Sequence, residues 1–112
     1  MPPSDNVVLV DPEIADLVPG FLTNRRAEAQ AMRRALEGSD LKGLARLGHD
    51  LRGCAPSYGF HELGHLGGEV EAAAQRGDAA ELEGYVSAIE DYLAAVRWAL
   101  DPDLEDEECM DW

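Results

Sequence analysis

One histidine of the chain stands beside residues that suit phosphoryl chemistry. His49 is followed by Arg52 three positions later and by Gly53 four positions later, and such spacings make residues neighbours on a helix surface. An imidazole has an ordinary pKa of about 6.5, so an unprotonated ring nitrogen is available as a nucleophile at neutral pH. Lys42 and Arg46 fall on the same side of the expected helix as His49. A phosphoryl group on His49 would therefore meet positive charge, and Gly53 would leave room for a second protein.

The helix expected to carry His49, residues 40–55, has its apolar side chains on another face. On a helical wheel of about 100° per residue, small and apolar side chains gather on one side. They are Leu41, Leu44, Gly48, Leu51 and Ala55, with Leu47 at the edge. The position of His49 outside this stripe argues against a buried core histidine and leaves an ordinary surface histidine as the alternative. The basic residues near it, in an otherwise acidic protein, suit an acidic partner surface.

The rest of the sequence predicts the helices that would hold this one in place. Asp11 and Pro12 are typical of a helix start and Gly38 of a helix end. Further starts are indicated by Ser39 or Asp40 and by Asp78. The expected helices are a short one at 12–18 and longer ones at about 20–37, 40–55, 60–75 and 79–100. Four substantial helices with short connections indicate an all-α, antiparallel four-helix bundle with a short extra N-terminal helix.

The two ends are expected to lie outside this bundle, which would span residues 11–100. Residues 1–10 include four consecutive apolar residues, Val7 to Val10, that could form a strand. Because no other segment is predicted to pair with them, we expect an N-terminal arm packed on the helices. Residues 101–112 contain seven acidic residues and no basic one, a composition that predicts a mobile acidic tail.

Composition excludes several classes of function. The 112 residues carry a formal net charge of −14, which argues against non-specific binding to nucleic acid or to an anionic membrane, since both depend on basic residues. No apolar run approaches the ~18 residues of a membrane-spanning helix, and no signal peptide is visible. We expect a cytoplasmic monomer, and the start at Met1 favours a free-standing protein.

The segment from His49 to Phe60, His-Asp-Leu-Arg-Gly-Cys-Ala-Pro-Ser-Tyr-Gly-Phe, resembles the signature of histidine phosphotransfer (HPt) domains. In that family an aliphatic residue follows the histidine at +2, Lys or Arg at +3, and Gly at +4 and +10, and all of these match, with Gly59 at the last position. The resemblance covers about residues 11–100. Two departures are visible: the family more often has Lys where Arg52 stands, and small, often hydroxylated residues where Cys54 and Ala55 stand.

The resemblance implies a four-helix bundle whose exposed histidine carries phosphoryl groups between receiver-domain aspartates in multistep two-component phosphorelays. It implies that His49 is the phosphoacceptor, that Arg52 assists the phosphate and that Gly53 permits docking. Lys42 and Arg46, together with Gly59, complete the expected docking surface. The implied partner is the receiver domain of a response regulator, of a hybrid histidine kinase, or of both. The chain would be a carrier without kinase activity and without a cofactor of its own, since the receiver supplies the magnesium ion.

A second motif competes with this interpretation. The segment from His61 to His65 spells H-E-x-x-H, in which two histidines hold zinc and Glu62 would be the general base of a metalloprotease. Gly68 fits the longer form of this motif, but Glu71 occupies the place of its third histidine. The glycines in and after the motif are explained equally well by close packing of this helix. We therefore expect no metal site here.

A third possibility is an adaptor that binds a receiver or a kinase without being phosphorylated. A bundle of this kind would not need the set formed by His49, Arg52 and Gly53. The presence of all three residues therefore favours the carrier over the adaptor.

Overall fold

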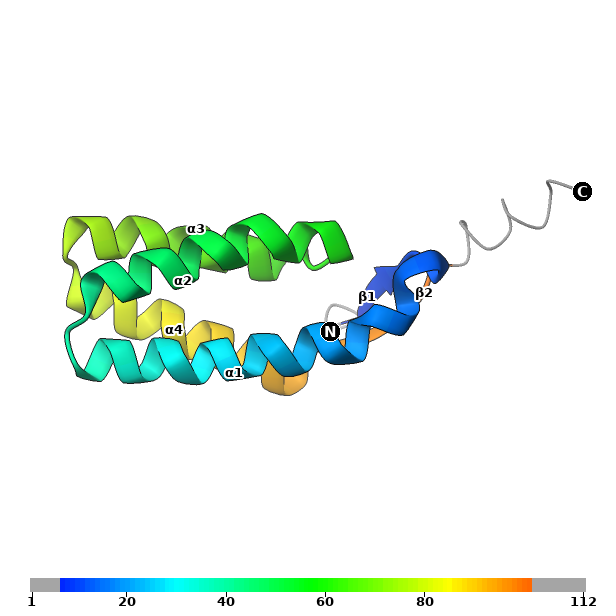
Figure 1. The fold of residues 1–112 in the computed structure, drawn as a ribbon, viewed down its shortest axis with the longest axis horizontal. Coiled ribbons are helices and arrows are strands. Elements are labelled where there is room, and N and C mark those ends of the chain that lie inside the picture. Colours follow the sequence, from blue (N-terminus) through cyan, green and yellow to red (C-terminus); the bar gives the residue numbers. More distant parts are fainter. Residues whose placement is uncertain (1–6, 102–112) are drawn as a thin grey trace, which may run out of the picture.

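The computed structural model describes residues 7–101 and confirms the expected all-α bundle (Figure 1). Its four helices are α1 (Val18–Glu37), α2 (Leu41–Cys54), α3 (His61–Arg76) and α4 (Ala79–Ala95). They lie side by side along the long axis of the molecule, and the short connections make consecutive helices antiparallel. None of the helices within residues 7–101 is long and apolar enough to cross a membrane.

Aspartate side chains begin the elements where the sequence predicts starts. Asp11 accepts a hydrogen bond from the Glu13 amide at 2.9 Å and begins η2 (Pro12–Leu17), the short extra helix, which has 3₁₀ geometry. Asp40 caps α2 in the same way by accepting from the Gly43 amide, and Asp78 caps α4. A capping oxygen satisfies one of the amides that the first turn of a helix leaves unpaired, so each cap fixes where its helix begins.

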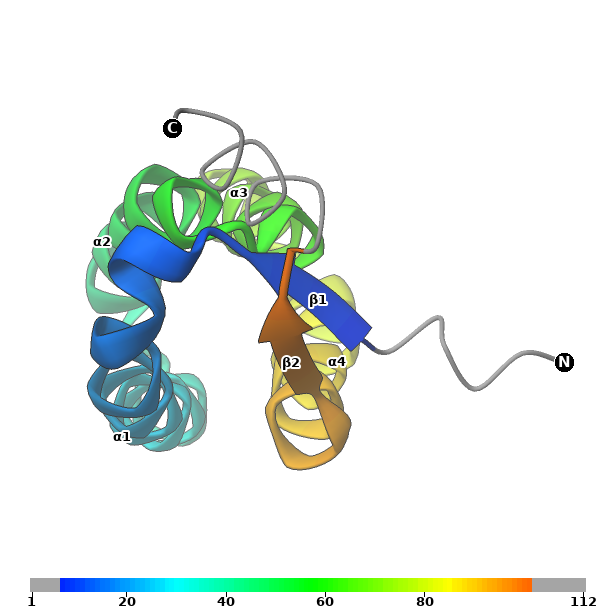
Figure 2. The same cartoon turned by 90° about the vertical axis from the view of Figure 1, so that its right-hand side faces the viewer.

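Two expectations for the ends of the bundle were wrong, namely that Val7–Val10 has no pairing partner and that the last helix runs to residue 100, whereas the N-terminal segment does pack on the core as expected. Val7–Val10 forms a strand, β1, that pairs in parallel with a second strand, β2 (Arg97–Leu100), in the register Val7 to Arg97 through Val10 to Leu100. The last helix therefore ends at Ala95 rather than at residue 100, because the chain turns extended at Val96. Figure 2 shows both strands at one end of the bundle. Residues 1–6 and 102–112, which include nearly all of the predicted acidic tail, lie outside the described residues.

One continuous core lies between the helices and the sheet. Its largest fully buried side chains are Phe60, Met32, Leu44, Leu51, Leu63, Leu82, Ile89, Val10, Val18, Val70 and Val86. Four of the five residues predicted for the core face of α2 are buried, but Leu41 is 39 % exposed. Leu41 is the first residue of the helix and lies at the end of the bundle, beside Gly77 at the end of α3.

Helices α2 and α3 approach each other more closely than ordinary side chains would allow. A Cβ built on Gly48 would lie 2.5 Å from the carbonyl oxygen of Gly67, and one built on Gly67 would lie 2.8 Å from the carbonyl oxygen of Gly48. Backbone therefore meets backbone at this crossing, as the glycines of the H-E-x-x-H segment had suggested. The contact fixes the register of α3 against α2, which decides which side chains of the two helices can meet.

Candidate functional site

His49 lies on the exposed face of α2, as the helical wheel predicted. Its side chain is 59 % exposed. Gly53 follows one turn later, and a Cβ built there would meet nothing within 4 Å. Gly53 therefore leaves open space one turn from the exposed ring.

A carboxylate from the neighbouring helix holds the imidazole. Oε2 of Glu71, on α3, lies 3.2 Å from Nδ1 of His49. Arg52 joins the pair, because its Nε lies 3.4 Å from Oε1 of Glu71 and its Nη2 lies 3.3 Å from Nδ1 of His49. The three side chains form a triad that draws on both helices.

The triad favours one tautomer of the neutral ring. Nδ1 of His49 either donates to Glu71 or accepts from Arg52, but it cannot do both. Donation to Glu71 is favoured, because the carboxylate then accepts from both His49 and Arg52. An unprotonated Nδ1 would instead place its lone pair 3.2 Å from the negatively charged Oε2 of Glu71. With the proton on Nδ1, the lone pair lies on Nε2. Nε2 is then the nucleophilic atom.

Sequence reasoning missed Glu71 as a member of this site. In the sequence, Glu71 was noted only because it stands where the longer zinc motif requires a third histidine. It lies 22 positions from His49, and no local spacing links the two. The close crossing at Gly48 and Gly67 places it, since Gly48 precedes His49 and Gly67 lies one turn before Glu71.

The other predicted docking residues divide into two groups. Lys42 and Arg46 are exposed on α2, and neither forms an ion pair with another residue of the range 7–101. Gly59 instead ends the short 3₁₀ turn η3 (Ala55–Tyr58) with φ 93°, a conformation that only glycine adopts readily. The turn alone accounts for this glycine, and its role in docking stays a prediction.

The two unusual residues of the signature do not contact the imidazole. Ala55 is fully buried. Cys54 has a free, partly buried thiol, and its Sγ accepts a hydrogen bond from Arg25 of α1 at 2.7 Å. Both residues therefore join α2 to the rest of the bundle.

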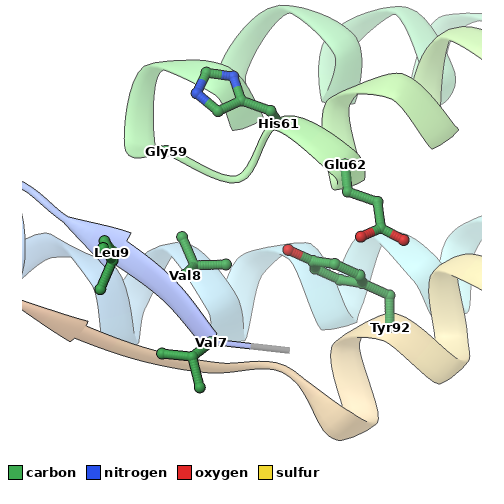
Figure 3. A pocket seen from close by; sticks show the side chains of 7 residues that line it. All are labelled: Val7, Val8, Leu9, Gly59, His61, Glu62 and Tyr92. Carbon is green, nitrogen blue, oxygen red and sulfur yellow. The ribbon is translucent and has the colours of Figure 1, made fainter. Parts of the chain in front are cut away.

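The H-E-x-x-H residues do not assemble a metal site. His65 is 73 % exposed and lies 3.7 Å from Glu69. His61 and Glu62 line a cavity of about 350 Å³ between β1 and the start of α3, where the carboxylate of Glu62 points toward Tyr92 (Figure 3). Across residues 7–101 no three His, Cys, Asp or Glu side chains come together in a way that could hold a metal ion. The zinc hypothesis therefore lacks a third ligand in the described chain.

Tyr92, which also lines this cavity, leads us to expect a loss of stability at alkaline pH. Burial, and secondarily the charge of Glu62, raises the pKa of the Tyr92 hydroxyl to about 12, whereas a tyrosine in an unfolded chain has a pKa of about 10. The folded state thus holds this proton more tightly than the unfolded chain does. Protonated Tyr92 therefore contributes to the free energy of unfolding below pH ~10, and this contribution is lost as pH rises toward 12. We expect Tyr92→Phe to reduce this loss in urea unfolding series between about pH 8 and pH 11. An equal reduction in Tyr85→Phe would contradict the assignment.

The comparison with family models finds one match. A model described as the Hpt domain matches residues 16–99, well over half of the chain. A search of curated proteins finds no match, and a search of solved structures finds none. The matched segment contains all four helices and each member of the triad. The chain therefore belongs to the Hpt domain family, whose members are phosphocarriers in histidine phosphotransfer relays.

Proposed function

We propose that this Hpt domain accepts a phosphoryl group on Nε2 of His49 from the aspartyl phosphate of a receiver domain and passes it to the aspartate of another. The observation that carries the proposal is the contact of Nδ1 with Glu71, which directs the free lone pair to Nε2 on an exposed ring. Magnesium belongs to the receiver in this scheme, and the chain needs no cofactor of its own.

The transfer step balances without further reactants. The Nε2 lone pair attacks phosphorus, the bond between phosphorus and the aspartyl oxygen breaks, and the aspartate leaves as its carboxylate. No proton has to move, because Nδ1 already carries one and Nε2 carries none. The ring gains positive charge, which the Glu71 carboxylate at 3.2 Å stabilises. The reverse step, toward the next receiver, follows the same path.

The surface beside His49 has the charge that a receiver would require. Arg46 and Lys42 lie about one and two turns before the histidine, respectively, on the same exposed side of α2, and both are free of ion pairs within the described residues. An aspartyl phosphate site is acidic, so these side chains would steer its approach and speed association. Gly53 leaves the space that close approach demands.

The proposal is tested by following the phosphoryl group itself. The protein is mixed with a phosphorylated receiver domain and magnesium, and its intact mass is recorded before and after a second, unphosphorylated receiver is added. We expect one acid-labile phosphoryl group, located on His49 by fragmentation, that disappears into the second receiver. Binding without transfer would favour the adaptor, and a phosphoryl group on another residue would overturn the site.

Removal of the Glu71 carboxylate tests how the ring is activated. A hydrogen bond to a charged group contributes about 1.5–3 kcal/mol, and the exposure of His49 places the expected effect near the lower end. Glu71→Ala should therefore slow single-turnover phosphoryl uptake by roughly tenfold. Glu71→Gln should lose less, because its amide oxygen still accepts from Nδ1.

Glu69 supplies the matched control for this prediction. It is another glutamate of α3 that contacts a histidine, His65, at 3.7 Å, and Glu69→Ala should leave uptake unchanged. Equal rates for wild type and Glu71→Ala would show that the carboxylate does not orient the ring.

A further inference from the structure

The side chain of Arg52 crosses α3 at a glycine. A Cβ built on Gly68 would lie 3.1 Å from Cδ and 3.7 Å from Cγ of Arg52. No other contact explains this glycine, because these two atoms are the only ones of the described residues that such a Cβ would meet within 4 Å. Glycine in a helix interior is less stable than alanine, so its presence in the middle of α3 calls for a reason.

The neighbouring glycines of α3 have different reasons. A Cβ on Gly64 would lie 2.9 Å from the ring of Pro56, and one on Gly67 would meet the backbone of α2. Those two positions set how closely the helices pack. Gly68 faces only a long, exposed side chain, which could move away at little cost in packing.

The path over Gly68 determines where the guanidinium ends. Gly68 lies one turn before Glu71 on α3, so a stem that lies flat there brings Nε to 3.4 Å from Oε1 of Glu71. The same path brings Nη2 to 3.3 Å from Nδ1 of His49. Arg52 therefore rests on the Nδ1 side of the ring and leaves Nε2 uncovered.

We propose that Gly68 is a positioning residue for phosphoryl transfer, which holds Arg52 in this retracted place by offering no Cβ. The inference rests on the function proposed above. A methyl group at 68 would push the arginine stem away from α3 by a few tenths of an ångström, weaken the contact of the guanidinium with Glu71 and leave Arg52 less ordered before the transfer step. A catalytic group that is already ordered before the reaction lowers the entropy cost of reaching the transition state.

A double-mutant cycle separates this role from simple helix packing. Single-turnover uptake from a phosphorylated receiver is measured for wild type, Gly68→Ala, Arg52→Ala and the double variant. We expect Gly68→Ala to be slower than wild type by roughly threefold to tenfold, and to have no further effect once Arg52 is alanine. Equal slowing by Gly68→Ala in both backgrounds would overturn the proposal, as would no slowing in the wild-type background.

Gly84 provides the matched control, because a Cβ there would meet nothing within 4 Å. Gly84→Ala should leave the rate unchanged, and the melting temperature of Gly68→Ala should not fall below that of wild type. Slower uptake with a lower melting temperature would indicate a packing defect and overturn the proposal.

A second readout needs no phosphoryl donor. The ¹⁵N shift of Nδ1 of His49 should change in the same direction in Gly68→Ala as in Arg52→Ala, and by less, because the first variant weakens the 3.3 Å contact of the guanidinium with Nδ1 and the second removes it. An unchanged shift in Gly68→Ala would overturn the inference about Gly68. Failure of wild type to take up phosphoryl groups from any receiver would instead overturn the proposed function, so the two failures are distinguishable.

Discussion

His49→Gln is expected to take up no phosphoryl group from any receiver domain, whereas His65→Gln keeps wild-type uptake. Glutamine retains the size and polarity of the side chain but has no nucleophilic ring nitrogen, so the bond to phosphorus cannot form. The intact mass of each variant after incubation with a phosphorylated receiver measures the result. The fold should not change, because the side chain of His49 is largely exposed.

His65 is a demanding control because its surroundings are superficially similar. It is an exposed histidine on the adjacent helix and lies 3.7 Å from a glutamate, Glu69. Within the described residues it lacks what His49 has, an arginine that shares its carboxylate. Loss of uptake in His65→Gln with normal uptake in His49→Gln would place the phosphoacceptor on α3 and contradict the site proposed here.

Gly67→Ala is expected to reduce the free energy of unfolding by about 1–3 kcal/mol, the usual cost of an added methyl group in a tightly packed interior. We place the effect toward the upper end because the new Cβ would lie 2.8 Å from the Gly48 carbonyl oxygen and 2.9 Å from the Arg52 amide nitrogen. Backbone atoms cannot rotate aside as a flexible side chain can. Urea unfolding monitored by circular dichroism measures the change.

The same substitution should also slow phosphoryl uptake under conditions where the protein remains folded. Separation of α2 and α3 would lengthen the 3.2 Å contact between His49 and Glu71, since those residues adjoin the crossing. Gly84→Ala is the control for stability and should raise it by up to about 1 kcal/mol, as expected for glycine replaced in an open helix. If Gly67→Ala proved as stable as wild type, the close crossing would not be a constraint on the fold.

Local rules were sufficient for the helices and for the exposure of His49. Asp11, Asp40 and Asp78 mark helix starts because a side-chain oxygen next to unpaired amides is a local effect, and all three caps are present. The periodicity of α2 placed His49 outside the core, which depends only on 3.6 residues per turn. Such features can be predicted because the atoms involved are close in sequence.

Features that depend on distant pairing could not be predicted in this way. The segment after Leu93 continues a helical spacing of apolar residues through Val96, and only pairing with Val7–Val10 makes Arg97–Leu100 a strand. Glu71 was missed for the same reason, since its contact with His49 depends on the register of two helices. That register follows from backbone contact at two glycines, which has no counterpart in hydrophobic periodicity.

The parallel pairing of β1 with β2 also has a mechanical consequence. Tension applied at Val7 and at Leu100 would pull the start of one strand away from the end of the other, along the direction of the strands. The hydrogen bonds of the ladder would then be loaded together in shear, whereas a hairpin pulled at its open end breaks one bond at a time. The two short strands thus resist stretching at one end of the bundle, and a force applied between these points should meet its main resistance there, before the helices separate.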